Sequence, residues 1–287
     1  MRVLVTGAHG QLGLEVAKQF RQKYELVLHD VDTLDISDYS AVIAAVKKIK
    51  PDIVINTAAY TNVDKSEDEP HLAFKANAAG PHNLAIACKR QKAKLVHIST
   101  DYVFDGTNSR PYDEADQTNP ISVYGKSKLL GERLIQQHGG CYFILRTSWL
   151  YGDGRNFVQT MLRLAEQQKE VSVVADQYGT PTYTKDLVWI IEKLMLSEAY
   201  GLYHASNNGF CSWYEFAKEI FAITGKHMIV KPLRTDEYPT IAQRPLYSVL
   251  ENHNLKLRDW DVMRPWHEAL EDYLQSFKTI KTSVEGI

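Results

Sequence analysis

The run Arg2-Val3-Leu4-Val5-Thr6 continues directly into Gly7-Ala8-His9-Gly10-Gln11-Leu12-Gly13, and this junction indicates the class of fold. The first run is short, apolar and rich in β-branched residues, which predicts a buried strand. Helical periodicity begins at Gln11, so the glycines stand where a strand turns into a helix. Glycines there let the backbone approach a pyrophosphate, which binds the free N–H groups of the helix N-terminus. The spacing G-x-x-G-x-x-G is one residue longer than the commoner fingerprint, and the alternative is a plain turn.

The same alternation of short apolar runs and longer helical stretches continues through the first half of the chain. We expect strands at residues 2–6, 25–30, 52–56, 94–100 and 142–147. We expect helices at residues 11–22, 38–49, 71–91 and 123–138. Such repeats build βαβ units, so the sequence predicts an α/β fold with a Rossmann-type, doubly wound parallel sheet.

The sequence changes character after Trp149, where glycine and proline become frequent and three tryptophans fall in loop-rich segments. We expect residues 1–148 to form the dinucleotide-binding domain. Residues 149–287 would form a smaller C-terminal substrate-binding domain, with later segments able to pack back onto the first. No Pro/Ser-rich linker separates the halves, so we expect them to pack closely.

Composition excludes several classes of function. The 287 residues carry a formal net charge of -2, which provides no basic field for binding nucleic acid. Three scattered cysteines, Cys88, Cys141 and Cys211, form no Cys-x-x-Cys pair and fit a reduced, cytoplasmic setting. Met1 is followed almost directly by the apolar run Val3-Leu4-Val5, so we expect no signal peptide. We also expect no membrane partner, because the apolar stretch at 187–196 is broken by Glu192 and Lys193.

The chemical signature is Tyr124-Gly125-Lys126-Ser127-Lys128, which begins an expected helix. Residues four apart lie on one face of a helix, so the Lys128 cation can favour ionisation of the Tyr124 phenol. Alone, this spacing usually marks only a solvated helix face. Together with the glycine-rich turn and with Thr100, the spacing indicates a catalytic site. Thr100 ends a strand and can hydrogen-bond a reacting carbonyl oxygen. Ser99 is the rival, but strand alternation points the two hydroxyls opposite ways.

Two further stretches are candidate cofactor contacts. Asp30 ends the second expected strand, where a carboxylate can bind an adenosine ribose and would repel a 2′-phosphate. This position favours NADH, although a solvated strand end is an equally good interpretation. The third strand is followed by Asn56-Thr57-Ala58-Ala59-Tyr60, whose small residues either leave room for a flat cofactor or simply pack tightly.

Together these motifs resemble those of the extended short-chain dehydrogenases/reductases, and within them the dTDP-4-dehydrorhamnose reductase family, over nearly the whole chain. The resemblance rests on residues 7–13, 56–65, 99–106, 124–128, 146–152 and 179–182 and on Arg244-Pro245. Residues 100–106, Thr-Asp-Tyr-Val-Phe-Asp-Gly, are the most specific part.

The resemblance implies reduction of the C4 ketone of dTDP-4-dehydro-L-rhamnose by NADH or NADPH, in nucleotide-sugar biosynthesis for cell-surface polysaccharides. It implies Tyr124 as proton donor, Thr100 as transition-state stabiliser and Lys128 as anchor of the cofactor ribose. Substrate contacts would be Thr100, Asp101, Tyr102 and Trp149. Cofactor contacts would be Gly7, His9, Gly10, Gln11, Leu12, Gly13, Asp30, Asp35, Ile36, Ala58, Ala59, Tyr60, Tyr124 and Lys128.

Other candidates have two interpretations each. Trp149 could stack on a thymine or a sugar, or belong to the core. Arg244 could clamp the nucleotide diphosphate, or be a surface arginine. Some members of the family are similar in having a Mg²⁺-bridged dimer built on glutamates, one of which would match Glu15, so the metal and the choice between monomer and homodimer stay open.

Tyr102 bears on the type of reaction. Relatives that eliminate water resemble one another in reading Thr-Asp-Glu, whereas this chain reads Thr100-Asp101-Tyr102. A protonated phenol is no base, so we expect no elimination. An epimerase of the same superfamily stays open, as does a non-catalytic protein similar to the regulatory subunit of methionine adenosyltransferase.

Overall fold

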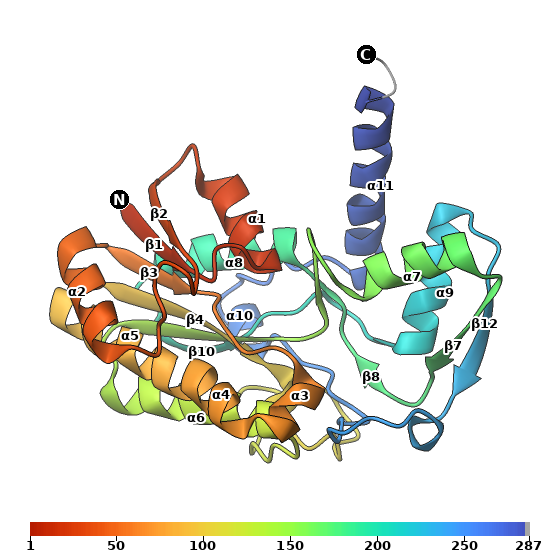
Figure 1. The fold of residues 1–287 in the computed structure, drawn as a ribbon, viewed down its shortest axis with the longest axis horizontal. Helices are drawn as coiled ribbons and strands as arrows, with labels where there is room; N and C mark the ends of the chain where they lie inside the picture. Colours follow the sequence, from red (N-terminus) through yellow and green to blue (C-terminus); the bar gives the residue numbers. More distant parts are fainter. Residues whose placement is uncertain (285–287) are drawn as a thin grey trace.

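The computed structural model describes residues 1–284, with side chains through residue 277, and is built around one parallel sheet (Figure 1). The sheet has six strands in the order β10-β5-β4-β3-β1-β2. The strands are β1 (Arg2–Thr6), β2 (Glu25–His29), β3 (Ile53–Asn56), β4 (Lys94–Thr100), β5 (Tyr142–Thr147) and β10 (Gly201–His204). All neighbouring pairs are parallel. The predicted Rossmann-type, doubly wound α/β fold is confirmed.

Helices cover both faces of this sheet, because alternate strand residues point to opposite sides (Figure 1). On one face, α1 (Gln11–Phe20) and α8 (Thr184–Met195) pack on strand residues such as Val3 and Val5. On the other face, strand residues such as Leu4 and Val54 pack on three helices. These are α2 (Tyr39–Ile49), α5 (Gly80–Gln91) and α6 (Val123–His138).

The helix expected at residues 71–91 is divided in the structure. It consists of α4 (Pro70–Phe74), a π-helical turn η1 (Lys75–Ala79) and α5. Pro81 lacks a backbone N–H and cannot close a normal helical hydrogen bond, which accounts for a break just before it. Short α3 (Val63–Asp68) and the 3-10 turn η2 (Asp101–Val103) complete this half.

The second half of the chain contributes to two cores. Its strand β10 pairs with β5 at the edge of the sheet, next to short α10 (His253–Lys256). Most of the remaining elements lie beside the sheet, where they pack around a separate core rich in aromatic residues. They include α7 (Phe157–Gln167), α9 (Trp213–Thr224) and α11 (Trp266–Val284). Three strand pairs link them: β6 (Leu150–Tyr151) with β9 (Thr182–Tyr183), β7 (Glu170–Val174) with β12 (Ile229–Leu233), and β8 (Tyr178–Gly179) with β11 (Cys211–Ser212). The 3-10 turn η3 (Thr235–Glu237) has no buried residue.

The sixth strand was not predicted from the sequence. Gly201-Leu202-Tyr203-His204 contains no β-branched residue, and its extended backbone is stabilised by pairing with β5. Within residues 1–284, none of the helices is both long enough and apolar enough to cross a membrane.

Candidate active site

A cavity of about 820 Å³ opens where β1, β3, β4 and β5 end. Its floor is the carboxyl edge of the sheet, which is where α/β folds bind their ligands. It brings together most of the predicted site residues. These are Gly7, His9, Gly10, Gln11, Leu12, Asp30, Asp35, Ile36, Ala58, Ala59, Tyr60, Thr100, Asp101, Tyr102, Tyr124, Lys128 and Trp149.

The glycine-rich turn forms a cradle with no space for side chains. Gly7 has φ of 72°, and a Cβ there would lie 2.5 Å from the backbone nitrogen of Ala58. A Cβ on Gly13 would lie 2.3 Å from the Gly7 carbonyl oxygen, so Gly13 lets the turn pack on α1 rather than lining the cavity. Gly10 caps α1 without a side-chain hydrogen bond, which leaves the first N–H groups of the helix free. This cradle fits a dinucleotide pyrophosphate.

The Asp30 carboxylate is held at the rim of the cavity by two backbone hydrogen bonds. Its Oδ2 accepts from the His9 N–H at 2.8 Å, and its Oδ1 accepts from the Val31 N–H at 2.8 Å. Asp35, nearby, accepts from the Ser37 hydroxyl at 2.6 Å, and this hydrogen bond lowers the pKa of Asp35. Both carboxylates therefore line the cavity as fixed negative groups.

The loop after β3 is tied to the helix that carries the tyrosine and lysine. The Tyr60 N–H donates to Oδ1 of Asn77 at 2.8 Å, and Nδ2 of Asn77 donates to the Tyr60 carbonyl and to Oγ of Ser127 at 3.0 Å each. Asn77 belongs to the π-helical turn η1, and Ser127 belongs to α6. The irregular turn thus positions Asn77 between two sides of the cavity.

The hydroxyls of Ser99 and Thr100 have different environments. Ser99 donates to the buried carboxylate of Glu132, which also pairs with Arg146 at 2.7 Å. Both residues line the cavity, but Oγ1 of Thr100 donates only to the neighbouring Oδ1 of Asp101, at 3.0 Å, and not to a buried ion pair. Of the two, the Thr100 hydroxyl is the one placed to meet a ligand.

Burial shifts the pKa of several groups in the cavity. It raises the pKa of Tyr124 to about 12, while a hydrogen bond with Thr100 acts in the opposite direction. It lowers the pKa of Lys128 to about 8, partly offset by Glu132. Burial raises the pKa of Asp101 to about 6.

Before Tyr124 gives up its proton, desolvation and not the Lys128 charge dominates the pKa of its phenol, which differs from our expectation. The ammonium of Lys128 donates to the Ile98 carbonyl at 2.5 Å, and desolvation of the phenol dominates the pKa of Tyr124. Tyr124 is therefore protonated at neutral pH, which is the state that a proton donor needs.

Tyr102 packs beside Tyr124, with ring centroids 5.6 Å apart and planes at 77°. Burial and the neighbouring Asp101 raise the pKa of Tyr102 above its ordinary value, so its phenol stays protonated. Tyr102 therefore supplies no base at neutral pH.

A sequence-family model, described as the RmlD substrate binding domain, matches residues 1–279 of this chain. The chain belongs to the RmlD substrate-binding domain family. The chain is 46% identical to spore coat polysaccharide biosynthesis protein SpsK of Bacillus subtilis, with 96% of this chain and 97% of that protein covered.

Two solved structures are similar to this member of the RmlD family. A dTDP-4-dehydrorhamnose reductase from Clostridium acetobutylicum is 48% identical with a TM-score of 0.96, covering 97% of this chain and 100% of that one. The enzyme of the same name from Bacillus anthracis, solved in complex with NADP, is 45% identical with a TM-score of 0.94, covering 96% and 99%. These matches confirm the predicted family and the class of NAD(P)H-dependent oxidoreductase.

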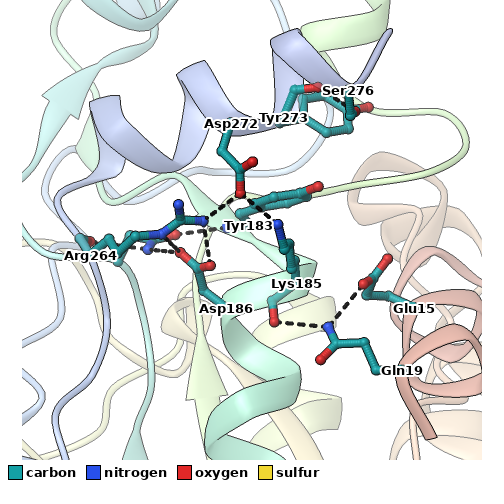
Figure 2. Close-up of polar contacts among 10 residues, drawn as sticks. Glu15, Gln19, Tyr183, Lys185, Asp186, Arg264, Asp272, Tyr273 and Ser276 are labelled. Carbon is teal, nitrogen blue, oxygen red and sulfur yellow. Dashed lines mark hydrogen bonds and ion pairs between the residues drawn. The ribbon is translucent and has the colours of Figure 1, made fainter. Parts of the chain in front are cut away.

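The surroundings of Glu15 do not fit the Mg²⁺ that the resemblance raised for this position, and Figure 2 shows Glu15 beside Gln19. Glu15 is 3% exposed, and its carboxylate accepts from Nε2 of Gln19 at 2.9 Å and lies 3.6 Å from Nζ of Lys18. Gln19 also donates to the Lys185 carbonyl, and the Lys185 ammonium binds Asp272 at 2.8 Å. Mg²⁺ needs several oxygen ligands. In the part of the chain that the structure describes, Glu15 has an amide and an ammonium beside it instead.

Arg244 is the one predicted substrate contact that lies outside the lining of the cavity. Its Nη2 pairs with Oδ2 of Asp64 at 2.8 Å, and Oδ1 of Asp64 accepts from the Ala242 N–H at 3.2 Å. The neighbouring Pro245 packs on Gly106, where a Cβ would lie 2.6 Å from the proline. In this structure Arg244 ties the 242–245 segment to α3, and its charge acts on Tyr102 in the cavity wall, so its contact with a substrate stays a prediction.

Sequence reasoning missed several residues of the cavity, among them two large side chains from the second half of the chain. Arg155 and Trp213 line it from segments that the sequence marks only as loop-rich or helical. Their positions depend on how the second half folds against the sheet, and no local pattern signals this. The Trp213 ring stacks on Trp149, with centroids 3.5 Å apart.

Proposed function

We propose that this chain reduces the C4 ketone of dTDP-4-dehydro-L-rhamnose to dTDP-L-rhamnose, with NADPH or NADH, in nucleotide-sugar biosynthesis for cell-surface polysaccharides. The observation that carries the proposal is the meeting of Thr100, Tyr124 and Lys128 with a glycine cradle in one cavity. Membership of the RmlD family, with relatives named for this reductase activity, supports the choice of substrate.

Residues 1–148 supply the dinucleotide site in this proposal, and residues 149–287 supply the nucleotide-sugar side. When bound, the reduced nicotinamide supplies the hydride that adds to C4. The turn at Gly7 and Gly10 would hold the pyrophosphate on the N-terminus of α1. Asp30 would face the adenosine ribose, and Lys128 would hold the second ribose.

Tyr124 is the proton donor in the proposed reaction. Its phenol enters protonated and releases its proton to the C4 oxygen, so that the ketone becomes an alcohol. The Thr100 hydroxyl donates a hydrogen bond to the same oxygen while negative charge develops there. The Lys128 ammonium stabilises the phenolate that remains, and solvent returns the proton to Tyr124.

Other features fit the same reaction. Tyr102 stands where a dehydratase needs a carboxylate, and its protonated phenol cannot remove a proton from C5. We therefore propose no dehydration of dTDP-glucose. The described cysteines Cys88, Cys141 and Cys211 are all free, which supports a cytoplasmic location.

The test is the stoichiometry of reduced cofactor against a dTDP-4-keto sugar. We expect one NADPH consumed for each dTDP-L-rhamnose formed. Purified protein that holds NAD⁺ tightly and interconverts sugars without consuming NADPH would establish an epimerase instead. Cofactor binding with no turnover would favour the non-catalytic, regulatory function.

A further inference from the structure

Trp149 has an uncommon backbone conformation at the mouth of the cavity. It lies between β5 and β6 with φ of 44°, in the left-handed region that bulky residues rarely adopt. Such a conformation costs free energy and persists only where the surrounding structure holds it. The contacts of the indole show what holds it here.

One face of the Trp149 indole is covered by Trp213. The two rings are stacked, with centroids 3.5 Å apart and planes within 8°. Trp213 begins α9, and Phe157 at the start of α7 packs on it with a centroid distance of 4.6 Å. The stacked pair is therefore anchored in the core of the second half.

The other face of the Trp149 indole is covered by Gly179. A Cβ on Gly179 would lie 2.4, 2.6 and 2.7 Å from Cε2, Nε1 and Cζ2 of Trp149. Near-equal distances to three consecutive ring atoms place Gly179 above the ring and not at its edge. Since Trp213 occupies one face, Gly179 occupies the opposite one. Pairing of β8 with β11 sets Gly179 against Cys211, two residues before Trp213.

With both faces covered, Trp149 can meet a ligand only through its ring edge. Trp149 still lines the cavity, and therefore its ring edge is the part that faces the cavity. An aromatic edge carries positive partial charge, whereas the face is negative. An edge therefore suits the oxygen atoms of a sugar better than stacking on a flat base.

We infer that Trp213 and Gly179 form a clamp that fixes Trp149 edge-on to the nucleotide sugar, which makes Trp213 a positioning residue for substrate binding. The inference deepens the proposed function and rests on it for the identity of the ligand. Trp213 itself lines the cavity, but its ring is stacked on Trp149, so in this assignment it acts by holding Trp149 and not on the reacting groups.

The test compares Trp213→Leu, which removes the stack, with Trp213→Phe, which keeps part of it. Stacked tryptophans give an exciton couplet in far-ultraviolet circular dichroism, and Trp213→Leu should abolish it. We expect the KM for the dTDP-4-keto sugar to rise by roughly threefold to tenfold, from the usual strength of an aromatic pair. The KM for NADPH should change by less than about twofold, and Trp213→Phe should restore most of the sugar KM.

Two further variants serve as a negative control and as an independent test of the clamp. Trp260→Phe removes a tryptophan that packs on Lys193 outside the cavity and should leave both the couplet and the sugar KM unchanged. Gly179→Ala displaces Trp149 from the opposite side and should reproduce the effect of Trp213→Leu, even if the latter fails to fold.

The outcomes separate the clamp from the proposed function. A couplet that survives in Trp213→Leu or Gly179→Ala overturns the clamp. A lost couplet with an unchanged sugar KM overturns the positioning role. Failure of the unsubstituted protein to oxidise NADPH overturns the proposed function, while the couplet still reports on the stack.

Discussion

The positive charge of buried Lys128 should increase activity but lower the stability of the folded protein. Burial lowers the pKa of Lys128 from 10.5 to about 8, a difference of about 2.5 units. At 1.36 kcal/mol per unit, holding the ammonium charged in the folded protein costs about 3 kcal/mol. The same charge is what stabilises the phenolate of Tyr124 in the proposed reaction.

The pH dependence of catalysis follows from this pKa. The charged form of Lys128 is lost above about pH 8, so kcat/KM for the dTDP-4-keto sugar should fall about tenfold per pH unit there. Tyr124, with a pKa of about 12, stays protonated through this range and adds no second step. The measurement is NADPH consumption between about pH 6 and pH 10.

Stability should change with pH in the opposite direction to activity. The folded pKa lies below the unfolded one, so the folded state binds fewer protons between about pH 8 and pH 10.5, and stability rises with pH there. Lys128→Met should raise the free energy of unfolding at pH 7 by about 2 kcal/mol. This is about 3 kcal/mol from removing the buried charge, less about 1 kcal/mol for the Ile98 carbonyl left unpaired.

Urea unfolding checks the stability, and exposed Lys126 on the same helix supplies the control variant Lys126→Met. The control should match the unsubstituted protein in both activity and stability. A kcat/KM that stays level to pH 10, or a Lys128→Met variant that is less stable than the parent, would refute the assignment of a desolvated ammonium.

Other predictions concern the acid, the cofactor and the buried carboxylate. Tyr124→Phe should lower kcat by about 10²-fold or more while NADPH affinity is unchanged, as titration by fluorescence will show. Asp30→Ala should shift the ratio of kcat/KM values toward NADPH by removing repulsion of its 2′-phosphate, and an unchanged ratio means no contact with the ribose. Gly13→Ala should weaken NADPH binding more than tenfold, because its Cβ would meet the Gly7 carbonyl at 2.3 Å. The pKa of Asp101 is raised to about 6, so stability is lost as pH rises from about 4 through 6. Asp101→Asn should therefore unfold at higher urea than the parent at pH 7 but not at pH 4.

The parts of the fold that the sequence predicted well have local causes. β1, β4 and β5 begin and end at the residues expected, because each is an apolar run rich in branched side chains. The start of α6 is equally local, since Ser122 caps it by accepting from the Gly125 N–H at 3.1 Å. The glycine-rich turn and the Tyr124–Lys128 spacing were visible for the same reason.

The parts that escaped prediction depend on distant contacts. β10 exists because it pairs with β5, and its own residues have no strong preference for a strand. Trp213 reaches the cavity through the fold of the second half, 64 positions beyond Trp149 in the sequence (213 − 149). The ion pair of Arg244 with Asp64, 180 positions earlier in the chain, is likewise not visible in any local pattern, and its contact with the substrate stays a prediction.

The most direct test of the proposed reductase is the fate of the transferred hydride. NADPH that carries deuterium at C4 of its nicotinamide is incubated with dTDP-4-dehydro-L-rhamnose, and the sugar product is analysed by mass spectrometry and proton NMR. We predict one deuterium at C4 of dTDP-L-rhamnose for each NADPH oxidised, and about 10²-fold less of this product or lower with Tyr124→Phe over the same time. Product without deuterium, or sugar interconversion without net oxidation of NADPH, would contradict the proposed reaction.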